Sequence, residues 1–110
     1  MTDTNLKGLP EGEYVTEIGY SQSYPWKVIK RTAHTVTVVP VLYARDPEWK
    51  PEIIPGGFAG HCTNQRQQTW LYAGIDESSP RTLRWGKRGL THKGVCYVEG
   101  RADYHYDYNF

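Results

Sequence analysis

Short runs that alternate apolar and polar residues make up most of this chain, and such runs predict β-strands. The strongest run covers residues 35–43, where β-branched side chains dominate. Residues 24–31 alternate as a half-buried strand does, with Trp26 and Val28 on one face, and we expect the two runs to pair as a hairpin. Pro40 has no amide proton to donate, so its side of the strand should lie at an edge or a bulge.

Glycine and proline links, rather than helical segments, separate the remaining candidate strands. These strands cover residues 13–18, 69–73, 81–85 and 94–98, and Gly86-Lys87-Arg88-Gly89 has the glycines of a hairpin turn. No segment keeps a helical period beyond about two turns. The sequence therefore predicts an all-β fold, a small antiparallel barrel or sandwich of five to seven strands with long loops, as a single domain over residues 1–110.

Three segments fall outside this strand pattern. Residues 1–12 hold polar, glycine and proline residues and look like a loose lead-in. Residues 44–68 form a connection long enough to suggest a functional loop. The tail, residues 104–110, alternates aromatic and polar residues, so as a strand it would gather four rings on one face. Because soluble monomers rarely expose such a stripe, we expect the tail to dock on the core or on a second subunit.

Composition narrows the function classes before any motif is considered. With 13 basic and 12 acidic residues the net charge is +1, so no overall field draws the chain to nucleic acid or to a membrane. No apolar run approaches the ~20 residues of a membrane span, and residues 1–10 lack the apolar stretch of a signal peptide. We therefore expect a cytoplasmic protein in which Cys62 and Cys96 remain free thiols. Nine tyrosines and four tryptophans favour binding surfaces and a homo-oligomer.

The reactive residue types do not form a catalytic or metal-binding pattern. Among the histidines and cysteines, only His92 and Cys96 have the spacing of structural zinc ligands, and the adjacent His61 and Cys62 would point opposite ways on a strand. No base has a fixed place beside Cys62. The acidic residues that could form a catalytic pair lie among turn residues, where carboxylates mainly give solubility: Asp46, Glu48, Glu52, Asp76 and Glu77. We expect no enzyme activity, no metal and no cofactor.

Two stretches point instead to ligand binding. Residues 81–93 contain five cations and no acid, and arginine forks bind phosphate through parallel hydrogen bonds. The alternative is a solvated hairpin whose charges keep a sheet edge soluble. Pro25 restrains Tyr24 beside Trp26, so the two rings form either an ordered stacking platform or a core Trp with an edge Tyr.

The long loop holds a third candidate. Its glycines, among them Gly56-Gly57, let the backbone turn back or approach another surface closely. Four amides follow in residues 64–68, and amides recognise polar ligands without adding charge. Because ordering a long connection is costly, we expect the part with Asn64, Gln65 and Arg66 to close over a ligand.

Several of these pieces together resemble a widespread set of small phage-encoded proteins. The pieces are Ser23-Tyr24-Pro25 followed by Trp26-Lys27-Val28-Ile29, the run from Gly56 to Gln65, Gln68-Thr69-Trp70, and the ending Tyr106-Asp107-Tyr108-Asn109-Phe110. The chain is also similar to the phage Thoeris anti-defence sponge proteins, which sequester cyclic ADP-ribose isomers, and in some cases cyclic oligonucleotides, without hydrolysing them. This resemblance implies a phage counter-defence protein that captures a small cyclic nucleotide in the host cytoplasm.

The residues then expected to bind the ligand are Tyr24, Trp26, Asn64, Gln65, Arg66, Arg84, Lys87 and Arg88. Arg84 and Arg88 are expected to contact its phosphates, with Lys87 in support. Two other functions remain open. One is an anti-CRISPR-like inhibitor that blocks a host defence protein through the tail and residues 81–93. The other is a single-strand or RNA-binding β-barrel, which the near-neutral charge disfavours.

Overall fold

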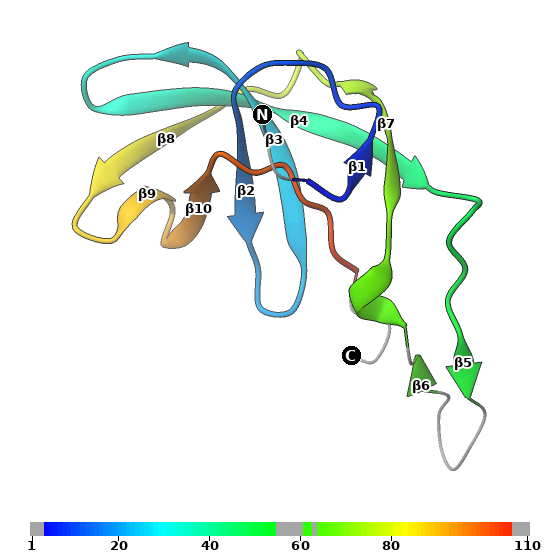
Figure 1. The fold of residues 1–110 in the computed structure, drawn as a ribbon. Helices are drawn as coiled ribbons and strands as arrows, with labels where there is room; N and C mark the ends of the chain where they lie inside the picture. Colours follow the sequence, from blue (N-terminus) through cyan, green and yellow to red (C-terminus); the bar gives the residue numbers. More distant parts are fainter. Residues whose placement is uncertain (1–3, 55–60, 63, 107–110) are drawn as a thin grey trace.

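The computed structural model describes residues 4–54, 61–62 and 64–106, and β-strands dominate these residues (Figure 1). The elements are β1 (Leu6–Lys7), β2 (Tyr14–Ile18), β3 (Ser23–Arg31), β4 (Thr35–Arg45), β5 (Ile53–Ile54), β6 (His61–Cys62), the 3-10 turn η1 (Gln65–Gln67), β7 (Trp70–Ile75), β8 (Arg81–Gly86), β9 (Gly89–His92) and β10 (Val95–Glu99). No described helix has the length and hydropathy that crossing a bilayer requires.

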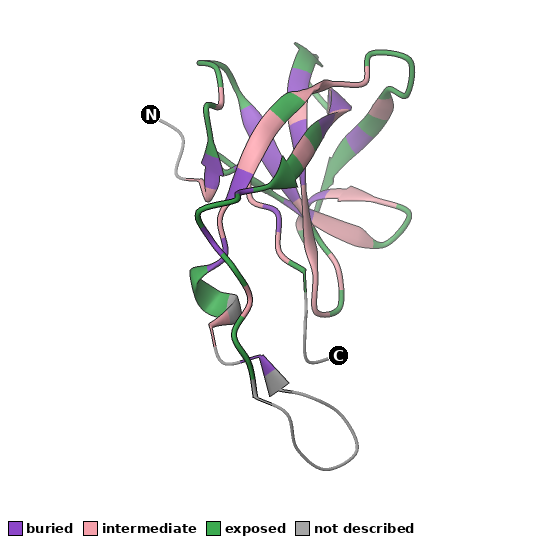
Figure 2. Ribbon diagram, turned by 90° about the vertical axis from the view of Figure 1, so that its right-hand side faces the viewer, coloured by how far each residue is buried: buried purple, intermediate pink, exposed green. Residues whose placement is uncertain are grey.

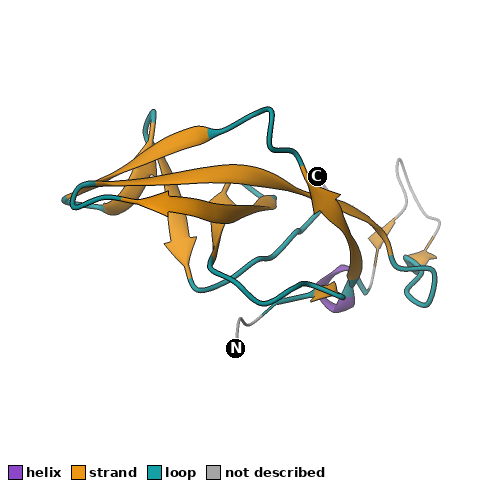
Figure 3. Ribbon diagram, turned by 90° about the horizontal axis from the view of Figure 1, so that it is seen from above, coloured by secondary structure: helices purple, strands orange, loops and turns teal. Residues whose placement is uncertain are grey.

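Six strands close into an antiparallel barrel, in the order β2, β3, β4, β8, β9, β10 and back to β2. Figure 3 shows these strands from above, with the single helical turn off to one side. The closing contact pairs Tyr97 of β10 with Glu17 of β2. Two further strands extend the sheet, since β7 pairs with β4 and β1 runs parallel to β7. The predicted all-β fold is therefore confirmed, and its barrel form is the correct alternative.

One edge of β4 accommodates two successive strands. β8 pairs with Thr35–Val38 and β7 pairs with Val41–Arg45, so the chain from β7 to β8 follows a single edge. Pro40 lies at the break between the two pairings, where its carbonyl accepts a hydrogen bond from the amide of Asp76 at 3.0 Å. The missing amide proton of Pro40 thus coincides with an irregularity of the ladder, as the sequence predicts.

Buried residues recur along the strands (Figure 2), and their side chains form two clusters. The barrel core consists of Val15, Trp26, Val28, Val36, Val38, Leu83, Leu90 and Tyr97. A second core lies beside the barrel, where β7 and β1 extend the sheet. It consists of Leu6, Tyr14, Val41, Trp70, Ala102 and Tyr104. Adjacent residues of β2, Tyr14 and Val15, point into different cores because side chains alternate along a strand.

The expectation of a loose lead-in is wrong for its described part. Leu6 is buried, and its strand pairs in parallel with Trp70 and Leu71. The Asn5 side chain binds the backbone of Tyr104, and Thr4 donates to the carbonyl of Ala102. The lead-in therefore serves as a structural strand that also holds the tail.

The described part of the tail, residues 104–106, lies against the second core, and residues 107–110 lie outside the described residues. Tyr104 is buried, with its ring centroid 3.7 Å from that of Tyr43 in a stacked arrangement. His105 forms a single antiparallel bridge with Ser23, so the tail makes one pairing rather than a full strand.

The long connection runs from the end of β4 to the start of β7 and carries the short β5–β6 ribbon, which Figure 1 shows projecting away from the barrel. Trp49 anchors its first half in the protein because its side chain is buried. Gly56-Gly57 lies outside the described residues. Cys62 is buried and Cys96 is half-buried, and the two sulfurs are not joined in a disulfide.

Candidate functional site

A hollow opens where β3 and β4 diverge. The two strands pair only as far as Trp26 opposite Pro40; beyond that point β4 pairs with β7, and Ser23 of β3 bridges to the tail. The space left between them is about 480 Å³. We call it the β3–β4 hollow, and its lining residues are Glu17, Tyr24, Pro25, Trp26, Pro40, Val41, Leu42 and Tyr43. This volume falls within the range of small-molecule sites, about 300–1,000 Å³.

Aromatic rings form much of the wall, and other rings support them from behind. Trp26 makes an edge contact with Tyr97 at a centroid distance of 6.4 Å. Tyr104 stacks on Tyr43 and lies 6.0 Å from Tyr24. Burial raises the pKa of Tyr43 and Tyr104, so both rings are neutral phenols at ordinary pH. The hollow thus offers fixed aromatic faces rather than mobile side chains.

One carboxylate and one guanidinium border these rings. Glu17 Oε1 accepts hydrogen bonds from Trp26 Nε1 at 3.0 Å and from Arg81 Nη1 at 3.4 Å. Within the described part of the chain, Glu17 Oε2 has no hydrogen-bond partner. Arg81 lies over the Trp26 ring at 4.4 Å from its centroid and donates to the Tyr97 hydroxyl at 2.6 Å. Burial raises the pKa of Tyr97, so its oxygen accepts this bond as a phenol.

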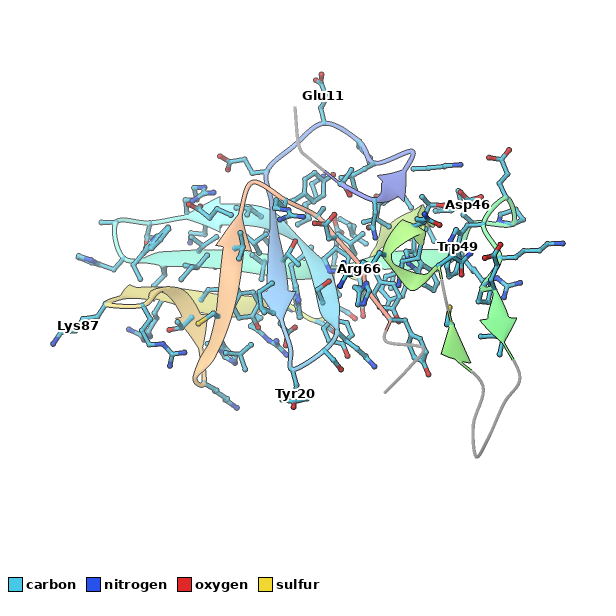
Figure 4. The ribbon with its side chains drawn as sticks, turned by 60° about the horizontal axis from the view of Figure 1, so that its bottom comes forward. Glu11, Tyr20, Asp46, Trp49, Arg66 and Lys87 are labelled. Atoms are coloured by element: carbon cyan, nitrogen blue, oxygen red, sulfur yellow. The ribbon has the colours of Figure 1, made fainter. Side chains whose placement is uncertain are left out.

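Two of the sequence-predicted site residues, Tyr24 and Trp26, meet in this hollow. The three cations Arg84, Lys87 and Arg88 do not. Arg84 lies opposite Thr35, whereas Trp26 lies opposite Pro40. Five residues along β4 separate the two positions, which amounts to roughly 16 Å at the usual rise per residue. Figure 4 shows Lys87 at the far tip of the β8–β9 hairpin.

The amide of Asn64 is engaged inside the protein. Its Oδ1 accepts a hydrogen bond from the Glu52 amide at 2.7 Å, and its Nδ2 donates to the Lys50 carbonyl at 2.7 Å. Asn64 therefore ties the two halves of the long connection together. Arg66 is exposed on η1 and distant from Lys87 (Figure 4), and the Gln65 side chain lies outside the described features. The eight residues are thus spread over three regions, and no single site contains them all.

The sequence interpretation missed Glu17, Arg81 and Tyr43 as lining or bordering residues. Glu17 lies two residues after the buried Val15, and Arg81 two residues before the buried Leu83, so both charges occupy inward positions of their strands. A charged residue at an inward position of a predicted strand was the signal that could have identified Glu17 and Arg81, because buried charges require a partner.

No protein-family model matches the chain, and neither a curated protein nor a solved structure matches it. The described residues also contain no group of three or more metal-ligating side chains. Any binding at the β3–β4 hollow therefore rests on the chemistry of its own lining residues.

Proposed function

We propose that the protein binds a small nucleotide without converting it and holds the base in the β3–β4 hollow. The observation that carries this proposal is the meeting of three aromatic rings with one carboxylate and one guanidinium at a single hollow. Tyr24, Trp26 and Tyr43 supply ring faces, and stacking a base on such a face contributes about 1–3 kcal/mol.

The polar groups suit the other parts of a nucleotide. Glu17 Oε2 is placed to accept a hydrogen bond from an exocyclic amino group of the base. Arg81, whose side chain is one-third exposed, has donors left for a phosphate after it binds Tyr97. Contacts with Trp26 and Tyr97 hold both side chains in place beforehand, which lowers the entropy cost of binding.

Retention rather than catalysis fits the lining residues, which include no serine, cysteine or histidine. Nanomolar capture requires about −12 kcal/mol, so stacking and charged hydrogen bonds must act together. The resemblance to sponge proteins makes cyclic ADP-ribose isomers and cyclic oligonucleotides the first ligands to test. Sequestration of a cyclic nucleotide immune signal by a phage protein is the biological role we propose.

Calorimetric titration with these nucleotides tests the proposal. Leu42→Glu places an acidic side chain in the hollow at a position that is 45% exposed, so it should repel the phosphate and weaken binding at least about tenfold without affecting the fold. Ile29→Glu is the matched control, because Ile29 is 51% exposed on β3 and does not line the hollow. Chromatography of the released ligand should return it unchanged. Equal affinity of the two variants, or a converted ligand, would contradict the proposal.

A further inference from the structure

A second hollow lies on the outer face of the barrel, across β8 and β9. Its volume is about 360 Å³, and its lining residues are Thr82, Arg84, Thr91, His92 and Lys93. Leu83 and Leu90, the buried neighbours in these strands, point into the barrel core, so Arg84 and Thr91 face outward as a directly opposed pair. We call this space the β8–β9 hollow.

Cations surround Thr91 on both sides. Arg84 lies opposite it on β8, and Cys96 lies opposite it on β10. The guanidinium of Arg88 reaches back from the hairpin turn to within 3.5 Å of the Cys96 sulfur. Lys93 lies in the next turn and completes the set. Three positive groups therefore surround one strand position.

These cations are not neutralised by the protein. The sequence between Glu77 and Glu99 contains no acidic residue, and Glu99 is paired with Arg31 at 2.8 Å. On β4, the residues opposite Arg84 and Thr82 are Thr35 and Thr37, which carry no charge. Within the described ranges, neither Arg84 nor Lys93 forms an ion pair. The charge of this surface is thus available to an anion.

The backbone conformation of Lys93 also points to a functional role for this turn. Its φ of 48° is left-handed, and it is the only non-glycine residue in that region among the described residues. Lys93 and Gly94 form the two-residue turn between the paired His92 and Val95, where Asn or Gly is the usual first residue. A strained residue type at such a position is often retained for function. In this turn the left-handed position is occupied by Lys93, which lies at the rim of the β8–β9 hollow.

We propose that the β8–β9 hollow is a phosphate-binding site. Arg84 supplies a planar fork, Lys93 an ammonium group, and Thr82 and Thr91 supply hydroxyl donors, which together match the oxygens of a phosphate. His92 Nδ1 lies 3.2 Å from the Thr82 carbonyl and donates to it, which fixes the ring at one wall. The site is independent of the β3–β4 hollow, and a terminal phosphate or a phosphodiester has the same chemistry here.

Titration of isotope-labelled protein with inorganic pyrophosphate at low salt, followed by amide NMR, tests this proposal. We expect saturable shifts confined to β8, β9 and the Lys93 turn. The double variant Arg84→Ala/Lys93→Gly should bind at least about tenfold more weakly. Its unfolding temperature should equal or exceed that of the parent, because glycine tolerates the left-handed turn.

Arg45→Ala/Lys50→Ala is the charge-matched control, since it removes two exposed cations from the long connection and its entry. It should leave pyrophosphate binding unchanged. A parallel titration with a short oligothymidylate identifies the source: stronger binding than pyrophosphate points to a phosphodiester, and weaker binding to a terminal phosphate. Equal weakening by the two double variants, or shifts that do not saturate, would overturn the site. Leu42→Glu, which lies in the β3–β4 hollow, should have no effect on pyrophosphate binding.

Discussion

Three amide side chains take the place of missing strand neighbours. Asn5 accepts from the amide of Tyr104 at 3.1 Å and donates to its carbonyl at 2.7 Å. Gln68 does the same for Tyr106, at 2.9 Å and 3.0 Å, and Asn64 connects Lys50 with Glu52. An amide suits this role because it carries a donor and an acceptor on one arm. The side-chain amides of Asn64 and Gln68 in the long connection thus bind the protein's own backbone, which composition alone does not distinguish from binding a ligand.

Asp46 is the charged residue on which a pH-dependent stability is expected. Its carboxylate accepts bonds from Lys7 at 2.7 Å, from Thr69 at 2.7 Å and from the Glu48 amide at 2.9 Å. Lys7 is the main cause that lowers the pKa of Asp46 to about 2, followed by the Glu48 amide and Thr69. Because the folded pKa lies below the unfolded value, the stabilisation is complete above that value and is lost as the pH falls towards 2.

We therefore expect the unfolding temperature to fall between pH 5 and pH 2, with a smaller fall in Asp46→Asn. Glu77→Gln, which changes an exposed acid in a turn, should keep the parental profile. Calorimetric scans at several pH values measure the unfolding temperatures of the parent and of the two variants. Parallel profiles for the parent and Asp46→Asn would show that the Lys7–Asp46 contact does not stabilise the fold.

At the scale of elements, the tail packs against several strands through one aromatic side chain. Tyr104 contacts Tyr43 by stacking and Trp70 edge-on at a centroid distance of 4.5 Å. The same ring supports the wall of the β3–β4 hollow through Tyr24. Because Tyr104 packs behind Tyr24 and Tyr43, the tail supports the wall of the hollow as well as covering the second core.

Tyr104→Ala should destabilise the protein by about 3–5 kcal/mol, the usual cost of removing a buried aromatic ring. Tyr106→Ala, at a position that is 43% exposed, should cost less than about 1 kcal/mol. Chemical unfolding monitored by circular dichroism gives both values. Similar losses for the two variants would mean that the Tyr104 ring does not fill the second core.

Most strands could be predicted from the sequence, because alternation along β3, β4, β8 and β10 is a local property of the chain. β1 could not, since two residues show no period and their strand exists only through Trp70, far along the chain. The β3–β4 hollow could not be predicted for the same reason, because it depends on pairing between distant parts of the chain. Tyr24 and Trp26 were recognised as neighbours, but the divergence of the strands depends on where β7 pairs.

At the scale of the whole molecule, the two cores share strands. β2 contributes Tyr14 to one and Val15 to the other, and β4 contributes Val38 and Val41 in the same way. Because both cores take side chains from the same strands, unfolding of one core exposes part of the other. The barrel and its added strands should therefore unfold as one cooperative unit.

Leu6→Ala in the second core and Leu90→Ala in the barrel core should each lower one common transition, by about 2–5 kcal/mol. Tryptophan fluorescence and circular dichroism should give coincident curves for both variants. Leu42→Ala, at an exposed position, should change stability little. Separate transitions, in which Leu6→Ala shifts only the first, would contradict a single unit.

The bonds between Asn5 and Tyr104 join residues 99 positions apart. Closing so long a loop carries a large entropy cost, and folds dominated by such contacts form slowly. During synthesis every barrel strand is complete by Glu99, while the second core still lacks Ala102 and Tyr104. The apolar side chains of that core stay partly uncovered until these two residues dock. We therefore expect species in which the tail has not docked to be the most prone to aggregate, because they expose the apolar side chains of the second core.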